Sequence, residues 1–510
     1  MPDFRLTRHL PSAESLTPWF IGGGFALAGI LLGYIVVVGS PIVIAVSLGA
    51  VLGILLLNAL PVAMWILLVG VFMFSGPVYM FVPELVKTGW LFSILGFFLT
   101  GAAMLYPVLG RHQPPGPLPF FVYLGISYVC LAIGLSVFSD GPLVEIVGGI
   151  KKYFQFWGVM FILATYPFAR DTFSRWLVFF GIVAVLQLPA TVLQRIFLVP
   201  YLSVVNADLA GFVPIDSVVG TFEGTLRGGG SSSVMSLFLV CVMAWLLSAR
   251  RDHLITDRKF WTMMVIALLP LGMGETKLIV VLLPLAFAMV YLDLVTHRPA
   301  LFLGGGLIAG LITLGFAYIY FVVQVPDARD MTVAERLQET IDYNFGNVGY
   351  FAGRGLNRFT AIVFWFKEHG WNDPVATIFG HGLGSSYGGD GTAPFTGHIN
   401  DRYPEKLIGQ TSSSSILWDL GLLGFTLFMG MVLSAWREAW RLANVVQAGA
   451  DRAACRTLLA AVSCIPLMAF YSDGITVIPS QQVFTMLSLG AVAWYSRGYR
   501  ASGMNQSISG

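Results

Sequence analysis

Residues 300–323 read ALFLGGGLIAGLITLGFAYIYFVV and carry no charged side chain. At about 1.5 Å per residue, a helix of this length crosses a hydrocarbon layer about 30 Å thick. The stretch has to be helical in such a layer, because backbone N–H and C=O groups in lipid have no water to bond. It therefore predicts a transmembrane helix.

Similar apolar runs fill almost the whole chain. Of its 510 residues, 56% are hydrophobic and 11% are charged, whereas an ordinary soluble domain carries about 25% charged residues. A water-soluble fold is excluded. We expect an all-α polytopic membrane protein, one integral membrane domain over residues 1–510, with about fourteen spans. The expected spans are 19–39, 41–57, 61–78, 89–109, 118–138, 153–168, 176–199, 231–248, 260–271, 277–294, 300–323, 413–436, 457–471 and 481–494.

Lys and Arg are divided unevenly between alternate connecting segments. Cytoplasmic loops of inner-membrane proteins are enriched in these residues. With the N-terminus inside, the cytoplasmic segments hold Arg111, Arg170, Arg175, Arg250, Arg251, Arg258, Lys259, Arg298, Arg437, Arg441, Arg452, Arg456, Arg497 and Arg500. Outside the large loop defined below, the opposite segments hold only Lys87, Lys151, Lys152, Arg227 and Lys277. This predicts a multi-pass protein of the bacterial inner membrane with both termini in the cytoplasm.

The beginning of the chain resembles a membrane anchor. Arg5, Arg8 and His9 precede the first apolar run, and no clear small-residue cleavage site follows it. Because a cleaved signal peptide has such a site, we interpret this segment as a signal anchor.

Two predicted extracytoplasmic segments are long, residues 200–230 and 324–412. Loops of the second length are usually functional or disordered. The second, large loop has helix signals, which are the capping box Thr332-Val-Ala-Glu335 and an apolar stripe formed by Leu356, Phe359, Val363 and Phe366. We therefore expect a partly helical loop, with the stripe docked on the bundle or at the lipid interface. The two halves of the chain are not similar, which disfavours a transporter built from repeated halves.

Cysteine and histidine give no cofactor signal. Cys130, Cys241, Cys455 and Cys464 have no metal-type spacing and read as packing residues. No histidine pair in the large loop has the i, i+4 spacing of a helix-borne metal site, although His381 and His398 share that loop with Asp401 and Glu405. We expect no metal and no other cofactor. The alternate glycines of residues 380–384 follow no buried parallel strand, so we reject a nucleotide site there.

Cations near the predicted outer face are the strongest site signal. They are Arg195, Arg227, Lys277, Arg354 and Arg358. Arg227 stands in Arg227-Gly-Gly-Gly beside a serine run that opens a helix, where glycine backbone N–H groups and the helix dipole favour an anion. A phosphate or pyrophosphate site is one interpretation. The alternative is that these side chains reach for lipid headgroups, as Lys and Arg commonly do at helix ends.

The loop resembles a known family. In order it contains Arg354, Ala361, the run IFGHGLGS at 378–385 and the run ILWDLGLLG at 416–424. This order is similar to that of the O-antigen ligase and O-antigen polymerase (Wzy-like) family, over roughly residues 227–424. The resemblance implies a GT-C-like, metal-independent membrane glycosyltransferase. Such enzymes transfer a glycan from an undecaprenyl-pyrophosphate carrier to an acceptor hydroxyl, and their arginine positions match Arg354 and Arg227.

One position departs from the ligase pattern. A histidine usually stands about eleven residues before the glycine that matches Gly421, and here that residue is Gln410. Glutamine cannot act as a general base, which favours a polymerase in which His398, Asp401 or Glu223 accepts the proton. Gln410 itself is either part of the site or a plain polar loop residue.

The resulting hypothesis is a polysaccharide polymerase of exopolysaccharide, capsule or O-antigen biosynthesis. It would join lipid-linked oligosaccharide repeats at the periplasmic face, with arginines neutralising the departing pyrophosphate. Its expected partners are the undecaprenyl-pyrophosphate-linked donor and acceptor, membrane lipids, and a chain-length regulator and flippase of the same pathway, with no nucleic acid. The alternatives are a ligase that passes glycan to lipid A core or protein, and a lipid-linked oligosaccharide flippase or other transporter.

Overall fold

The computed structural model describes residues 29, 33, 53, 56–81, 89–108, 116–206, 214–224, 232–274, 278–318, 334–335, 338, 341–342, 345–346, 355–389 and 395–508. The chain forms two compact units, residues 1–63 and 64–510. The second unit carries all described candidate site residues. The predicted helix at the Thr332 capping box lies largely outside the described residues, as do the predicted spans 19–39 and 41–57.

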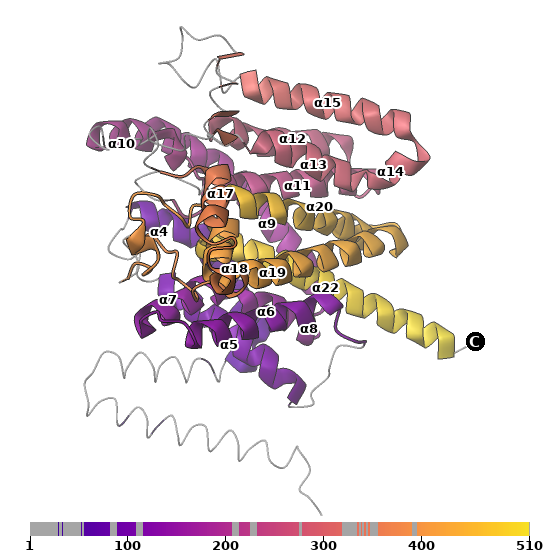
Figure 1. Ribbon diagram of the computed structural model, residues 1–510. Coiled ribbons are helices and arrows are strands. Elements are labelled where there is room, and N and C mark those ends of the chain that lie inside the picture. The colour runs from indigo at the N-terminus through magenta and orange to yellow at the C-terminus, as the bar shows by residue number, and fades with distance from the viewer. Residues whose placement is uncertain are drawn as a thin grey trace, which may run out of the picture. The chain divides into compact units, whose positions relative to one another are not determined.

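The described residues form helices and no β-strand (Figure 1). In chain order the elements are α3 (Leu60–Val69), η1 (Gly70–Phe74), α4 (Ser75–Phe81), α5 (Gly89–Val108), α6 (Phe120–Val137), α7 (Leu143–Phe154), α8 (Trp157–Thr165), α9 (Arg170–Leu193), η3 (Gln194–Leu198), α10 (Val199–Val205), η4 (Pro214–Ser217), α11 (Ser232–Arg251), α12 (Asp257–Met273), α13 (Ile279–Val290), α14 (Leu292–His297), α15 (Pro299–Tyr318), α17 (Arg358–Glu368), α18 (Pro374–Phe379), η8 (Asn400–Arg402), α19 (Ser412–Val445), α20 (Ala450–Tyr471), α21 (Gly474–Val477) and α22 (Pro479–Ile508).

Seven described helices are long and apolar enough to cross a membrane. They are Leu60–Val78, Gly89–Val108, Phe120–Val137, Arg170–Val205, Ser232–Arg251, Ser412–Val445 and Ala450–Tyr471. Each overlaps a predicted span, and the predicted span 457–471 is part of the longer helix Ala450–Tyr471. Shorter or more polar helices occupy five further predicted spans. The all-α membrane class is thus supported, while the total of fourteen stays a prediction.

The predicted span at 153–168 is not one continuous helix. The helix is interrupted at Gln155 and Phe156, between the amphipathic helix α7 and the short helix α8. The Gln155 side-chain carbonyl accepts a hydrogen bond from the Ser93 hydroxyl of α5 at 2.7 Å. Every residue from Trp157 to Ala164 is buried, and α8 packs between α5 and α22. This central element places α7 at one end of the bundle.

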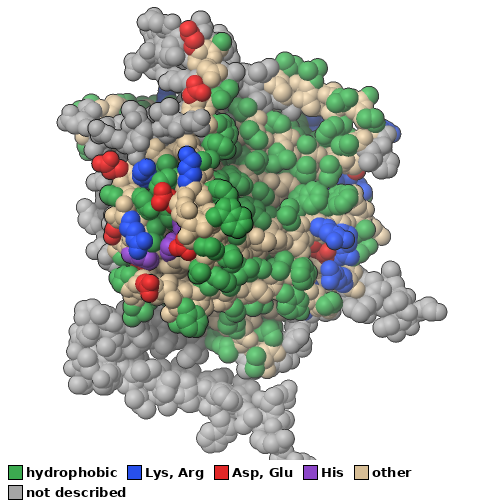
Figure 2. Space-filling model, in the orientation of Figure 1, with side chains coloured by type: hydrophobic (Ala, Val, Ile, Leu, Met, Phe, Trp, Pro, Cys, Tyr) green, Lys and Arg blue, Asp and Glu red, His purple; other side chains and the backbone are tan. Residues whose placement is uncertain are grey.

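Helix α19 runs between two opposite ends of the described bundle. Its 34 residues correspond to about 50 Å at 1.5 Å per residue. Residues 355–389 and 395–411 pack where α19 begins and α20 ends, and we call this the loop end. The other end, near Val445 and Ala450, is called the far end. In Figure 2 charged side chains gather toward two sides of the molecule, with a largely hydrophobic surface between them.

An ion-pair network joins three helices at the far end. Asp252 pairs with Arg452 at 2.7 Å and with Arg456 at 3.2 Å, while Arg251 pairs with Asp293. The Arg452 and Arg456 guanidinium groups lower the pKa of the Asp252 carboxyl against the opposing effect of its burial, which is the largest single influence. These arginines belong to the set assigned to the cytoplasm from the sequence. Their common end agrees with that assignment, which stays a prediction.

Candidate functional site

The loop end is organised around a break in helix α19 at Gly421. Gly421 has φ 64°, and a Cβ there would lie 2.4 Å from the Ile378 carbonyl oxygen. The break leaves the carbonyls of Trp418 and Asp419 free to accept hydrogen bonds from the backbone N–H groups of His381 at 3.0 Å and Gly382 at 2.8 Å. Residues 380–386 (GHGLGSS), here called the glycine loop, are therefore held against the broken helix.

The Asp419 carboxylate fixes the rest of the glycine loop. It is buried and accepts hydrogen bonds from the backbone N–H of Gly384 at 3.0 Å and of Ser386 at 2.8 Å. The hydroxyls of Ser385 and Tyr153 donate to it at 2.8 Å each. Four donors on one carboxylate compensate for its burial. The glycines serve this close packing between loop and helix.

A buried carboxylate on α7 holds the imidazole of His398. Glu145 is 1% exposed, and one of its oxygens lies 2.8 Å from His398 Nδ1. Its other oxygen accepts the His398 backbone N–H at 2.8 Å. A carboxylate on Nδ1 favours the tautomer with the proton at Nδ1, which leaves Nε2 as the proton acceptor. His398 is partly exposed, so this pair has the chemistry of an oriented general base.

Two further histidines lie beside this pair. His369 Nε2 and His381 Nε2 are 2.8 Å apart, and His369 Nδ1 lies 3.0 Å from the Trp365 carbonyl oxygen. Because a carbonyl only accepts, His369 carries its proton on Nδ1 and its Nε2 accepts from His381 Nε2–H. Burial and the neighbouring His369 and His398 lower the pKa of His381 to about 4, and burial lowers the pKa of His369. Both rings are therefore neutral at pH 7.

Glu145, His369, His381 and His398 together are called the histidine cluster. The rings of His381 and His398 are 6.5 Å apart. In Figure 2 histidine side chains reach the surface among acidic and basic ones, on the left of the view. Within the described ranges no group of three or more His, Cys, Asp or Glu side chains is arranged to hold a metal ion.

A second polar feature surrounds Glu223. Its side chain is 5% exposed, and neither carboxylate oxygen has a partner with hydrogen-bond geometry. Burial raises its pKa, while the nearby Ser480 and Ser75 hydroxyls lower it by a smaller amount. The buried amide of Gln481 also lacks a partner. Buried polar groups are normally satisfied, so Glu223 and Gln481 stand out among the buried polar side chains of the described residues.

Arg195 follows Gln194, whose side chain contacts the segment that carries Glu223. The amide of the preceding residue, Gln194, accepts from the backbone N–H groups of Val219 at 3.0 Å and Gly220 at 2.8 Å. It also donates to the Gly220 carbonyl at 2.6 Å. The helix end with Arg195 therefore packs against residues 214–224. Arg227, Lys277 and Arg354 lie outside the described residues.

The structure assigns other partners to three further candidates. The Nε of Arg358 donates to the Tyr471 carbonyl at 2.6 Å, and the Arg358 guanidinium lies 4.0 Å from the centre of the Tyr471 ring. Arg358 therefore fastens α17 to the end of α20. Asp401 is exposed and accepts from the Thr396 hydroxyl at 3.2 Å. The backbone N–H of Gln410 donates to the Leu407 carbonyl, and Gln410 is partly buried.

The apolar stripe predicted for α17 does not dock on the bundle through Phe359 and Phe366, and docking at the lipid interface stays a prediction. The helix exists, and Asn357 caps it with a side-chain oxygen that accepts the Thr360 N–H. However, its buried face is formed by Ala361 and Trp365, whereas Phe359 and Phe366 are exposed. Trp365 packs with Trp418 of α19. The tryptophan is the larger apolar side chain, and its position determines which face turns inward.

Sequence reasoning missed Glu145, His369, Asp419 and Tyr153. Glu145 is 253 residues away from His398, and Tyr153 is 266 residues away from Asp419. Only the charge of Glu145 and Asp419 within apolar surroundings was a signal, since buried carboxylates need partners. Comparison with protein-family models and with curated proteins finds no match for this chain.

Proposed function

We propose that this protein is a polysaccharide polymerase that joins lipid-linked oligosaccharide repeats at the outer face of a bacterial inner membrane. The observation that carries the proposal is the Glu145–His398 pair at the loop end, with Nδ1 2.8 Å from the carboxylate. The motif order at 354–424 and the apolar bundle are further support. A membrane-embedded enzyme with a solvent-facing base suits a donor that has a lipid tail and a polar glycan.

The proposed step is a direct displacement at the anomeric carbon of the donor sugar. His398 Nε2 accepts the proton of an acceptor hydroxyl, and the hydroxyl oxygen forms a bond to that carbon. The bond between the carbon and the pyrophosphate oxygen breaks, and undecaprenyl pyrophosphate leaves with its negative charge. Arg227 and Arg354 neutralise this charge. Glu145 is a positioning residue, because its carboxylate holds the Nδ1 side of the imidazole and so orients Nε2.

Glu223 and Gln481 fit the role of sugar-binding groups. Both are buried with unpartnered polar atoms, and sugar hydroxyls both donate and accept. The raised pKa of Glu223 favours a carboxyl that retains its proton more readily than a solvated one. In this proposal Glu223 holds a sugar hydroxyl, and His398 is the base.

The test is the lipid-linked material in a deletion strain complemented with variants. We expect the deletion strain to accumulate single repeats. His398→Ala should lower polymer formation by about 10²–10⁴-fold, the usual contribution of a general base. Glu145→Gln should lower it less and leave the concentration dependence on acceptor unchanged. Glu405→Gln, a change at an exposed position of the same segment, is the control and should match wild type.

Three results would overturn the proposal. Accumulation of full-length chains means a ligase, and repeats retained on the cytoplasmic face mean a transporter. Wild-type polymer in His398→Ala at equal expression removes the base from the mechanism.

A further inference from the structure

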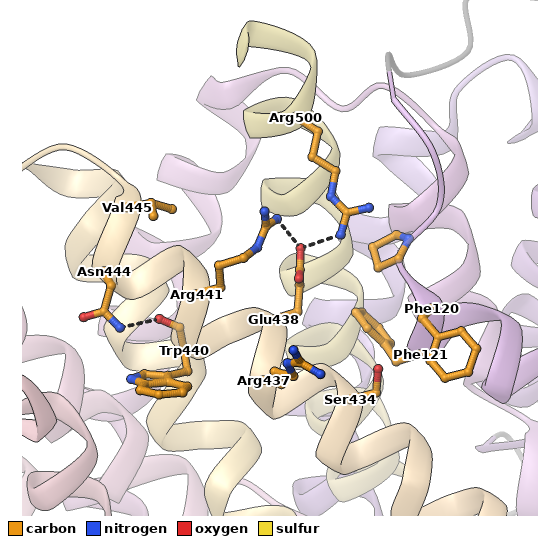
Figure 3. Close-up of a pocket in the computed structure, with 11 residues that line it drawn as sticks. Phe120, Phe121, Ser434, Arg437, Glu438, Trp440, Arg441, Asn444, Val445 and Arg500 are labelled. Carbon is orange, nitrogen blue, oxygen red and sulfur yellow. Dashed lines mark hydrogen bonds and ion pairs between the residues drawn. The ribbon is translucent and has the colours of Figure 1, made fainter. Parts of the chain in front are cut away.

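A pocket of about 620 Å³ opens at the far end of the bundle, remote from the histidine cluster. It lies between the last turns of α19, the C-terminal part of α22 and the start of α6 (Figure 3). Its lining combines charged and apolar side chains. The lining includes Arg437, Glu438, Trp440 and Arg441 of α19, Phe120 of α6 and Arg500 of α22.

The lining has an excess of positive charge. Glu438 accepts from Arg441 at 2.5 Å and from Arg500 at 3.0 Å, as the dashed lines in Figure 3 mark. Arg437 is exposed and forms no ion pair with any other described side chain. The lining thus holds three guanidinium groups and one carboxylate, and two of the guanidinium groups pair with it. Each contact to Glu438 uses one terminal nitrogen, so both paired arginines keep N–H donors for a second anion.

Two large apolar side chains in the lining are exposed at the surface of the protein. Phe120 is 66% exposed and Trp440 is 44% exposed. A soluble protein would have little reason to leave such rings in contact with water, but they suit the boundary between headgroups and acyl chains. A small inorganic anion needs only the charges. The joint presence of charge and exposed rings points to a ligand with an anionic head and an apolar tail.

We propose that this pocket binds the phosphate headgroup of an anionic phospholipid. The phosphodiester oxygens accept from Arg437, Arg441 and Arg500, and the acyl chains lie along Phe120 and Trp440. Basic pockets between transmembrane helices are suited to such headgroups, because each Lys or Arg near an anionic lipid surface contributes about 1 kcal/mol. The lipid would brace α19 against α22 and α6 at their far ends. Neither the proposed function nor its donor is required for this site.

Binding can be measured with the purified full-length protein in phosphatidylcholine nanodiscs. Phosphatidylglycerol is titrated in, and lipid bound per protein is counted by native mass spectrometry. Wild type should bind phosphatidylglycerol in preference to phosphatidylcholine. Arg437→Gln should weaken this binding about fivefold, which corresponds to about 1 kcal/mol at tenfold per 1.4 kcal/mol. Phe120→Ser tests the acyl-chain contact and should weaken it too.

Arg258→Gln is the matched control. It makes the same charge change at an exposed position of α12 outside the pocket, and it should bind like wild type. Thermal unfolding in phosphatidylcholine verifies that every variant is folded. Equal loss in Arg258→Gln would mean general surface attraction and overturn the site. If inorganic phosphate displaces the lipid fully at millimolar concentration, or Phe120→Ser binds normally, the pocket holds a free anion and the lipid assignment fails.

Discussion

Glu145 and His398 show how a single contact gives a residue its chemistry. A lone histidine in a polar loop has an ordinary imidazole, but the buried Glu145 carboxylate fixes its tautomer and orientation. Removing one member of a buried charged contact is costly, because the remaining group is left without compensation. The effect of Glu145→Gln on the function therefore has to be read at equal amounts of folded protein.

The pH response of the loop should come from His381. The folded protein lowers the pKa of His381 from 6.5 to about 4, so between these values the unfolded segment binds a proton that the folded one does not. The folded loop is therefore not destabilised by His381 above about pH 6.5, and its free energy of unfolding decreases as pH falls toward 4. We expect faster limited proteolysis of residues 355–411 at pH 5 than at pH 7. His381→Asn should reduce this difference, and an unchanged difference would contradict the assignment.

Arg227 and Arg354 are proposed to bind the pyrophosphate of the donor. Arginine offers a planar fork that holds two phosphate oxygens, whereas lysine offers one hydrated point of charge. Arg227→Ala and Arg354→Ala should abolish polymer while the protein still inserts normally, and lysine at either position should restore part of it. Arg358→Ala should act differently, since Arg358 binds Tyr471, and lower the stability of α17 first. Wild-type polymer in both alanine variants would make these arginines interfacial anchors.

At the scale of elements, the break in α19 is the feature that assembles the site. A continuous helix would keep the carbonyls of Trp418 and Asp419 within its own hydrogen bonds and leave no place for the glycine loop. Gly421 provides the break because its φ of 64° suits glycine and its missing Cβ admits the Ile378 carbonyl.

Gly421→Ala should therefore destabilise the protein. An L-residue at this φ of 64° and ψ of −166° costs about 1–3 kcal/mol, and the contact of 2.4 Å with Ile378 adds to this. Gly430→Ala is the control in the same helix, because its new methyl group would meet Leu124 at 3.8 Å and would improve helix propensity by about 1 kcal/mol. Thermal unfolding in detergent should show a lower midpoint for the first variant only. A midpoint at the wild-type value for Gly421→Ala would mean that the break is not required.

At the scale of the whole molecule, the two ends of the bundle differ in their polar groups. The loop end carries the histidine cluster and Glu223, and the far end carries the ion-pair network and the pocket. The distribution of Lys and Arg predicts which end faces the cytoplasm.

Reporter fusions test that orientation. Fusions after Asp252 and Gly449, both at the far end, should report the cytoplasm. Fusions after Ala207 and Gly391 should report the extracytoplasmic side, since positive charge is retained inside during insertion. A reversed result at Asp252 would place the histidine cluster in the cytoplasm, and the proposed function would fall with it.

The sequence by itself determined the helical class, because hydropathy over about twenty residues is a local property. A single apolar segment in lipid has to satisfy its own backbone hydrogen bonds, and a helix does so. It also predicted helices at 356–366 and 413–436, which overlap α17 and α19, and it named His398 as one candidate base. Local patterns did not reveal which face of α17 packs on the bundle, because Trp365 is positioned by Trp418 from another element. The partners of His398 and Asp419 were decided only by the tertiary structure. Glu145 and Tyr153 reach them across more than 250 residues of chain, and no periodicity in the sequence encodes a distance set by the packing of α7 against α19 and the glycine loop.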